Sequence, residues 1–184
     1  MNRIDQLIEN YRSHIQMPLR IGLAAPQRVW FAVYPAGEER RLINRIDEFA
    51  MSTKDAGHPW VRIDLKGRLA EWIASVDEEE RAEWFKNPGD VDLYAKTEWK
   101  DVLTESINQA IACTTAPEQT VFALTGLMEL YDFLHVSELI EGVLKNFHGY
   151  MLVFFPGEKD DNNYRFLDAR TGWNYLAVPI LSER

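Results

Sequence analysis

The chain has 184 residues, and its 46% hydrophobic and 27% charged residues are ordinary for a globular protein, which argues against disorder. Its net charge of −9 argues against a general affinity for nucleic acid and makes direct DNA contact a weak expectation, because binding to phosphates depends on lysine and arginine. The one cysteine, Cys113, excludes an internal disulfide and a cysteine-based zinc cluster. Its place at the end of an amphipathic segment predicts a packed core thiol.

No segment of the sequence is typical of membrane insertion. Charged residues stand near the N-terminus, at Arg3 and Asp5, where a signal peptide needs an apolar core. No apolar run approaches the roughly 20 residues that span a bilayer. We therefore expect a cytoplasmic protein without membrane contact.

The charge is spread unevenly along the chain. Residues 1–45 carry seven arginines against four acidic residues, and residues 76–105 carry ten acidic residues against four basic ones. Such a division is compatible with docking to a charged partner, and equally with ordinary solvated faces. Both interpretations stay open at this point.

The first third of the chain predicts helices and strands in alternation. Asn2 and Asp5 form a helix N-cap, and apolar residues then recur at helical spacing. The unbroken apolar run at 29–34 (VWFAVY) is typical of a strand buried on both faces. The run at 61–65 (VRIDL) alternates apolar and polar residues and so predicts a half-exposed strand. Helices are expected over 4–15 and 42–50, and strands over 29–34 and 61–65.

The middle of the chain is predicted to be helical. After a short helix around 69–73, Ser75 and Glu78 form a capping box for an acidic helix. The Asn-Pro-Gly sequence at 87–89 closes that helix, and a longer helix is expected over 99–111.

The last third returns to strands. Apolar runs predict strands over 120–124 and 150–155, the second of them ending at the Pro-Gly pair that follows it. A helix capped by Ser137 is expected between them. The final predicted strand, 175–178, precedes Pro179, which cannot donate to a ladder and so places that strand near an edge.

This alternation predicts the fold class. Continuously apolar strands separated by helices indicate an α/β protein with a mostly parallel, doubly wound (Rossmann-like) sheet and helices on both faces. No internal repeat or linker interrupts the pattern. We therefore expect a single domain over residues 1–184.

The sequence contains none of the motifs that carry common chemistries. The spacing of its ten glycines excludes both the dinucleotide-binding GxGxxG motif and a P-loop. The four histidines show no HExxH or HxH spacing, and no GxSxG elbow is present. The sequence predicts no catalytic residue, no cofactor and no metal.

One region remains as a candidate for recognition. In doubly wound sheets, ligands bind outside the carboxyl ends of the strands. Polar and aromatic residues gather there, although Arg165–Asp168 or Asp168–Arg170 pairs could simply tie the turn together. The predicted partner-binding residues are Tyr34, Glu158, Asn162, Asn163, Tyr164, Arg165, Asp168, Arg170 and Trp173.

Three C-terminal stretches are distinctive: 152–157 (LVFFPG), 162–170 (NNYRFLDAR) and 172–180 (GWNYLAVPI). Supporting stretches stand at 27–34 (QRVWFAVY), 56–58 (AGH) and 136–141 (VSELIE). Together they resemble the BrxB family of BREX phage-defence systems. The resemblance covers nearly the whole chain.

The resemblance implies a small component of a phage-defence locus. Its neighbours there are a large ATPase, an adenine-specific DNA methyltransferase and PglZ, which is similar to alkaline phosphatases. No enzymatic role is established for the family, so no catalytic residues carry over. The implied function is a non-enzymatic adaptor that contacts PglZ, or else the methyltransferase complex or the ATPase subunit.

Two other functions stay open. The first is a degenerate or unrecognised enzyme acting at the strand carboxyl ends through Asp168, Arg165 or Tyr164. The second is a DNA-contacting subunit that uses the arginine-rich N-terminal region, where a local basic face could offset the acidic net charge.

Overall fold

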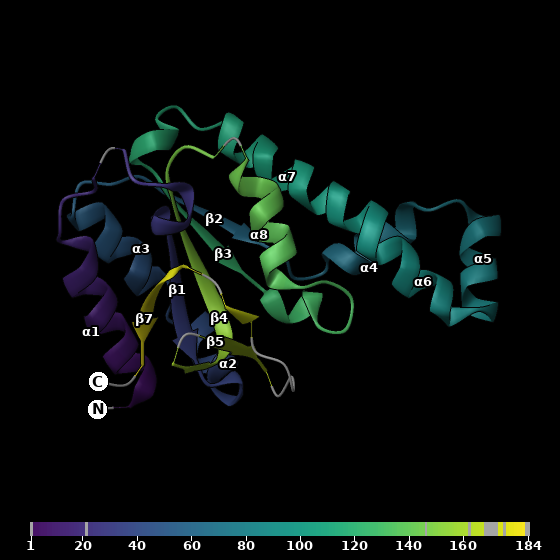
Figure 1. Ribbon diagram of the computed structural model, residues 1–184, viewed down its shortest axis with the longest axis horizontal. Coiled ribbons are helices and arrows are strands. Elements are labelled where there is room, and N and C mark those ends of the chain that lie inside the picture. Colours follow the sequence, from purple (N-terminus) through teal and green to yellow (C-terminus); the bar gives the residue numbers. More distant parts are fainter. Residues whose placement is uncertain are drawn as a thin grey trace. The chain divides into compact units, whose positions relative to one another are not determined.

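A computed structural model describes residues 2–20, 22–145, 147–161, 163–167, 173–174 and 176–182 (Figure 1). Its contacts divide the chain into two compact units, each of which is described by itself below. Unit 1 consists of Met1–Ile63, Thr115–Thr125 and His148–Arg184, and unit 2 consists of Asp64–Thr114 and Gly126–Phe147. The expectation that the chain folds as one domain stays a prediction.

Unit 1 contains the sheet. Its main strands follow the order β2-β3-β4-β1-β7, and β1 pairs in parallel with both β4 and β7, as β3 does with β4. The strands are β1 (Val29–Tyr34), β2 (Trp60–Asp64), β3 (Val121–Thr125), β4 (Tyr150–Asp160) and β7 (Val178–Leu181). This mixed α/β fold, with a mostly parallel sheet flanked by helices, is Rossmann-like and confirms the predicted class.

The two central strands carry the apolar runs. β1 and β4 pair from Val29–Met151 to Tyr34–Pro156, and all six residues of β1 are buried. Burial on both faces is what an unbroken apolar strand requires, so this prediction is confirmed. β2, which lies at the edge of the main sheet, is half-exposed, as its alternating sequence predicts.

Two helices cover one face of this sheet, α1 (Arg3–Ile15) and α3 (Ile46–Asp55), and they lie side by side (Figure 1). The ring of Phe49 in α3 packs against Tyr11 at 5.2 Å and edge-on against Phe154 of β4 at 4.9 Å, both measured between ring centroids. The short helix α2 (Glu39–Ile43) comes just before α3. The buried residues of α1 are Ile4, Leu7, Ile8, Tyr11 and Ile15, which confirms the predicted apolar stripe.

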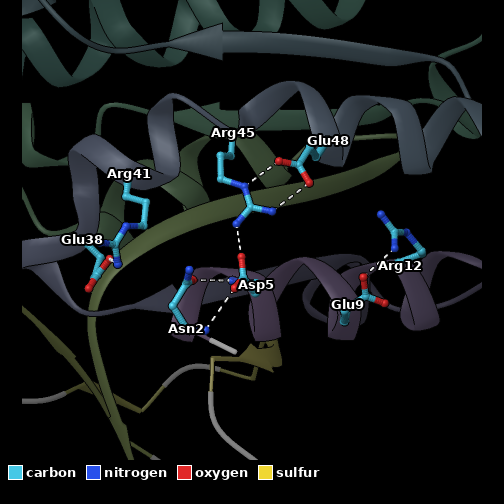
Figure 2. Close-up of polar contacts among 8 residues, drawn as sticks. All are labelled: Asn2, Asp5, Glu9, Arg12, Glu38, Arg41, Arg45 and Glu48. Atoms are coloured by element: carbon cyan, nitrogen blue, oxygen red, sulfur yellow. Dashed lines mark hydrogen bonds and ion pairs between the residues drawn. The ribbon is translucent and has the colours of Figure 1, made fainter.

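An ion-pair network joins the first turns of these two helices (Figure 2). Asn2 and Asp5 form the predicted capping box, with hydrogen bonds of 2.9 and 3.0 Å. Arg45, at the N-cap of α3, donates to Asp5 and also holds Glu48 at 2.5 and 2.9 Å. One guanidinium therefore ties a carboxylate of α1 to one of α3.

The other strands of unit 1 form a hairpin. β4 does not stop at Pro156-Gly157 as predicted but continues to Asp160, where it turns and pairs antiparallel with β5 (Asn163–Phe166). A Cβ atom at Gly157 would lie 2.0 Å from the carbonyl oxygen of Arg165, so the glycine permits strand pairing rather than ending the strand. The two-residue strand β6 (Trp173–Asn174) pairs with β5.

The last strand is shifted relative to the prediction. β7 begins at Val178, the last residue of the predicted 175–178 strand, and Tyr175 lies outside the described residues. β7 carries Pro179 and lies at the edge of the main sheet beside β1, so the expected edge position is confirmed. Proline is tolerated at an edge because one side of the strand needs no ladder donor.

Unit 2 is helical. It consists of α4 (Arg68–Ser75), α5 (Glu78–Lys86), α6 (Pro88–Tyr94), the π turn η3 (Ala95–Trp99), α7 (Lys100–Ala112) and α8 (Val136–Leu144). α7 and α8 pack closely where Gly142 faces Thr104, since a Cβ at Gly142 would lie 3.2 Å from the Thr104 hydroxyl. The Asn-Pro-Gly sequence at 87–89 predicts only the end of α5, so α6 is not expected from the sequence. Pro88 also begins α6, because the first N–H groups of a helix have no partner within the helix and proline lacks that group.

A continuous series of aromatic rings forms the centre of unit 2. Trp72 lies 5.2 Å from Trp84 and 6.3 Å from Trp99, Trp84 stacks on Tyr94 at 5.3 Å, and Trp99 meets Phe133 edge-on at 6.1 Å. The π turn matters here, because its wider spacing brings residues five apart, Tyr94 and Trp99, toward the same side of the helix.

Three local predictions are wrong. Asp77 caps α5 through the Glu79 amide, while the Ser75 hydroxyl donates to the carbonyl of Trp72. Ser137 lies inside α8, whose N-cap position is His135. Cys113 is exposed, because it follows α7 as the C-cap residue, beyond the buried stripe.

We predict that Phe154→Ala lowers the free energy of unfolding by about 3–5 kcal/mol, through lost burial and the cavity left beside Phe49. Urea denaturation of the purified variant measures the change. Met51→Ala, at a position 62% exposed on α3, is the control and should stay within about 0.5 kcal/mol of the wild type. A wild-type midpoint for Phe154→Ala would contradict the central position of β4.

The Arg45 network predicts a pH dependence of stability. Hydrogen bonding to Arg45 lowers the pKa of both Asp5 and Glu48. A carboxylate with a lowered folded-state pKa stabilises the fold above its unfolded pKa, about 4, and that contribution is lost as the pH falls through the folded value. We expect the free energy of unfolding to fall on acidification below about pH 5, and to fall less steeply in Arg45→Gln.

Urea titrations from pH 7 to about pH 3 test this expectation. Arg68→Gln, which removes an exposed pair with Glu71 in unit 2, serves as the control and should keep the wild-type slope. Equal slopes for the wild type and Arg45→Gln would show that the network does not govern the acid response.

Candidate functional site

A cavity of about 370 Å³ opens at the carboxyl ends of β1, β4 and β7, where the rule for doubly wound sheets places ligands. Val33, Gly157 and Leu181 contribute one position from each strand. The described residues of its lining are Arg3, Val33, Pro35, Gly157, Glu158, Lys159, Leu181 and Ser182. Among the predicted residues that the structure describes, Glu158 belongs to this lining.

The walls of this cavity carry both signs of charge. Arg3 is the first residue of α1, and Glu158 and Lys159 follow each other on the extension of β4. The Lys159 ammonium donates to the backbone carbonyl of Asp161 within the hairpin turn. A mixed, water-accessible lining of this kind suits a polar group of a partner protein, which could pair with either charge.

Tyr34 does not line the cavity, although its neighbours Val33 and Pro35 do. Alternation along β1 turns its ring to the opposite face, where it is 2% exposed and belongs to the core under α1 and α3. The hydroxyl donates to the Glu39 carboxylate, and burial raises the pKa of the phenol above its ordinary value. Tyr34 therefore holds the start of α2 and offers no ring to a partner.

Tyr164 is also buried. It is 1% exposed, its ring lies 4.8 Å from Phe31 and 5.8 Å from Phe155, and its hydroxyl donates to the Ala177 carbonyl at 3.1 Å. Burial raises the pKa of the phenol to about 12, so it stays protonated at neutral pH. The structure thus gives Tyr164 a packing role in place of the expected recognition role.

Arg165 and Asn163 lie on the other side of the same strand and are exposed. The Arg165 guanidinium lies 3.7 Å from the Asp160 carboxylate across the hairpin, and Asp168, with which a pair was expected, lies outside the described residues. The alternation exposed, buried, exposed, buried along β5 could have been found in the sequence Asn-Tyr-Arg-Phe. An exposed pair of this kind contributes little to stability and leaves the guanidinium accessible.

The remaining predicted residues cannot be placed in the site. Asn162, Asp168 and Arg170 lie outside the described residues. Trp173 is described by its backbone, which pairs with Tyr164 in the β5–β6 ladder. The structure therefore brings together Glu158, Asn163 and Arg165 of the predicted set, on one exposed hairpin.

Three arginines of the N-terminal region form ion pairs with nearby carboxylates (Figure 2). Arg12 pairs with Glu9 at 2.5 Å, Arg41 with Glu38 at 2.7 Å, and Arg45 with two carboxylates. Cations that neutralise neighbouring carboxylates offer less net charge to a phosphate backbone. This weakens the argument for a DNA-contacting surface here.

The sequence indicates an acidic helix after Ser75 but not the large apolar side chains that this part of unit 2 exposes. We call residues 77–94, which contain α5 and α6, the acidic arm; in Figure 1 they lie at the end of unit 2 away from α8. Phe85 is 77% and Leu93 61% exposed on this arm, whereas Trp84 is 3% exposed and holds α5 to Trp72 and Tyr94. The adjacent rings of Trp84 and Phe85 were the available signal, because successive residues of a helix point about 100° apart and a narrow buried stripe covers only one of them.

The arm carries seven acidic and two basic residues, and both basic residues have local contacts. Arg81 donates to the carbonyls of Ala74 and Val76 at 3.0 and 3.3 Å, closing the end of α4. Lys86 pairs with Glu83 at 2.6 Å. The carboxylates of the first turn of α5, residues 78–80, are exposed to solvent, as is Phe85 near the end of the same helix.

Neither a metal-binding cluster nor a membrane-spanning helix occurs within the described ranges. No group of three or more His, Cys, Asp or Glu side chains among them is placed to hold a metal ion. Within the same part of the chain, no helix combines the length and the apolar character that crossing a membrane requires.

Comparison with known proteins does not show a family. No family model, no curated protein and no solved structure matches the chain. The resemblance to the BrxB family, carried mainly by residues 152–180, is therefore a proposal about this chain.

The hairpin geometry predicts effects of very different size on stability for two neighbouring residues. Tyr164→Ala removes a buried ring and should lower the free energy of unfolding by about 3–5 kcal/mol, whereas Arg165→Ala should change it by about 0.5 kcal/mol or less. Chemical denaturation of both variants measures the difference. Comparable losses at the two positions would mean that the alternation along β5 is misassigned.

Proposed function

We propose that the protein is a non-enzymatic docking subunit, which binds a basic surface of a partner protein through the acidic arm. The observation that carries this proposal is the exposure of Phe85 and Leu93 among carboxylates. An apolar anchor with a charged rim is the arrangement typical of a protein interface, in which the anchor supplies affinity and the rim steers association.

The division of charge supports the same proposal. Unit 2 holds sixteen acidic and seven basic residues and so accounts for the net charge of −9, whereas unit 1 holds thirteen of each. A strongly acidic helical unit attracts basic surfaces over distances of about a Debye length, roughly 8 Å at physiological ionic strength. The partner we propose is therefore basic at its contact surface, with an apolar groove that admits the Phe85 ring.

The resemblance to the BrxB family supplies the candidate assembly. We propose that the chain acts as an adaptor in a BREX phage-defence system, with PglZ as the first candidate partner and the methyltransferase or ATPase subunit next. Deleting the protein should then abolish phage exclusion. The exposed hairpin residues Glu158, Asn163 and Arg165 offer a second contact surface in unit 1.

We predict that Phe85→Gln folds normally and loses about thirtyfold or more in affinity for the partner, which corresponds to a hot-spot contribution of about 2 kcal/mol. Folding should be retained because the ring is 77% exposed. Titration of purified wild type and variant against purified PglZ, and then against the other two BREX subunits, measures the loss. Leu176→Gln, at a site 76% exposed in unit 1, is the matched control and should keep wild-type affinity.

Salt provides an independent measure of the same interface. Raising the ionic strength should weaken wild-type binding, because the carboxylate rim is solvent-exposed. Binding that is unchanged in Phe85→Gln and insensitive to salt would place the interface elsewhere. Turnover of a nucleotide or nucleic acid by the purified protein, lost on a change at Glu158 or Arg165, would replace this proposal with the enzymatic alternative.

A further inference from the structure

A second, larger cavity lies at the opposite end of the central strands. Its volume is about 540 Å³, within the roughly 300–1,000 Å³ that small-molecule pockets occupy. Trp30, Tyr150 and Val178, which stand at the starts of β1, β4 and β7, contribute to its lining. Its described lining shares no residue with that of the cavity at the carboxyl ends.

The floor of this cavity is made of packed rings. Trp30 is 3% exposed, and its ring lies 4.9 Å from that of Tyr150 and, edge-on, 4.7 Å from His14 of α1. The Tyr150 hydroxyl donates to the backbone carbonyl of Arg20 at 2.6 Å, which fixes the chain after α1 as one wall. The aromatic floor is therefore held in place from both α1 and the following segment.

The rim is apolar and open to solvent. Met17 is 55% exposed, and Leu23 lines the cavity from the same connecting segment. Methionine adapts its shape to different apolar surfaces, which makes it common at binding surfaces that accept small ligands.

The charge around the cavity is positive. Arg20 belongs to the described lining, which contains no Asp or Glu. Arg28 approaches from the base, where its guanidinium donates to the Gly149 carbonyl at 3.3 Å and acts electrostatically on Tyr150. Burial lowers the pKa of the His14 imidazole, which disfavours its cationic form. An anionic group is therefore favoured over a cationic one.

We propose that this cavity binds an amphipathic carboxylate, with its apolar chain or ring on Trp30, Tyr150 and Met17 and its carboxylate toward Arg20. The apolar lining supplies the contact area, and the guanidinium fixes the orientation of the ligand. The site is independent of the docking function proposed for the acidic arm.

Titration calorimetry with decanoate, below its micellar concentration, tests the proposal on the full-length protein. We expect saturable one-to-one binding of decanoate, binding at least about tenfold weaker for decanol, and none for decyltrimethylammonium, because Arg20 selects the anion. Equal binding of all three amphiphiles, or no saturable binding of decanoate, would overturn the proposal.

Two variants and a matched control locate the site. Met17→Asp should lose at least about tenfold in affinity for decanoate, and Arg20→Gln should lose the preference for decanoate over decanol. Met51→Asp, at an exposed methionine outside the cavity lining, should bind as the wild type does. A loss equal to that of Met17→Asp in this control would show that decanoate binds elsewhere.

A second copy of this chain is the other occupant that the cavity could take. Sedimentation velocity without ligand distinguishes it from a small ligand. We expect Met17→Asp to leave the oligomeric state unchanged. A dimer in the wild type that Met17→Asp dissociates would assign the cavity to self-association and overturn the small-ligand proposal.

Discussion

The parallel pairing of β1 with β4 is the constraint on which the rest of unit 1 depends. Both strands are buried on both faces, so their backbone hydrogen bonds are made within the sheet and their side chains must find apolar cover on each side. α1 and α3 supply that cover on one face, and Tyr164 contributes to it on the other. The ends of the same strands position the two cavities described above.

Unit 2 is organised by a different interaction. Its rings, from Phe133 through the tryptophans to Tyr94, form one continuous contact series, and the acidic arm depends on that series through Trp84. A helix of nine residues with one buried side chain has little cohesion of its own, since isolated helices this short are marginal in water. The rest of its surface is therefore available for recognition rather than for packing.

The position of the candidate site in the fold was predictable, but the side chains that line it were only partly so. The rule that ligands bind at strand carboxyl ends located a cavity that includes Glu158. Tyr34 and Tyr164 were selected for their residue type, yet the pleat turns both rings into the core. The arm was missed because the unequal charge of residues 76–105 does not reveal which apolar side chains the fold leaves exposed.

By itself, the sequence determined the α/β class, the buried central strands, the first helix with its Asn2–Asp5 cap and the edge position of the Pro179 strand. Each of these features follows from local periodicity or from a residue's own backbone chemistry. Only the tertiary structure decided that β4 runs through Gly157 into a hairpin, that Arg45 joins two helices, and that the chain forms two compact units. These features depend on contacts between residues far apart in the chain, and such contacts leave no period in the sequence. The exposure of Phe85 is of the same kind, because a side chain is exposed or buried only by what the rest of the fold places next to it.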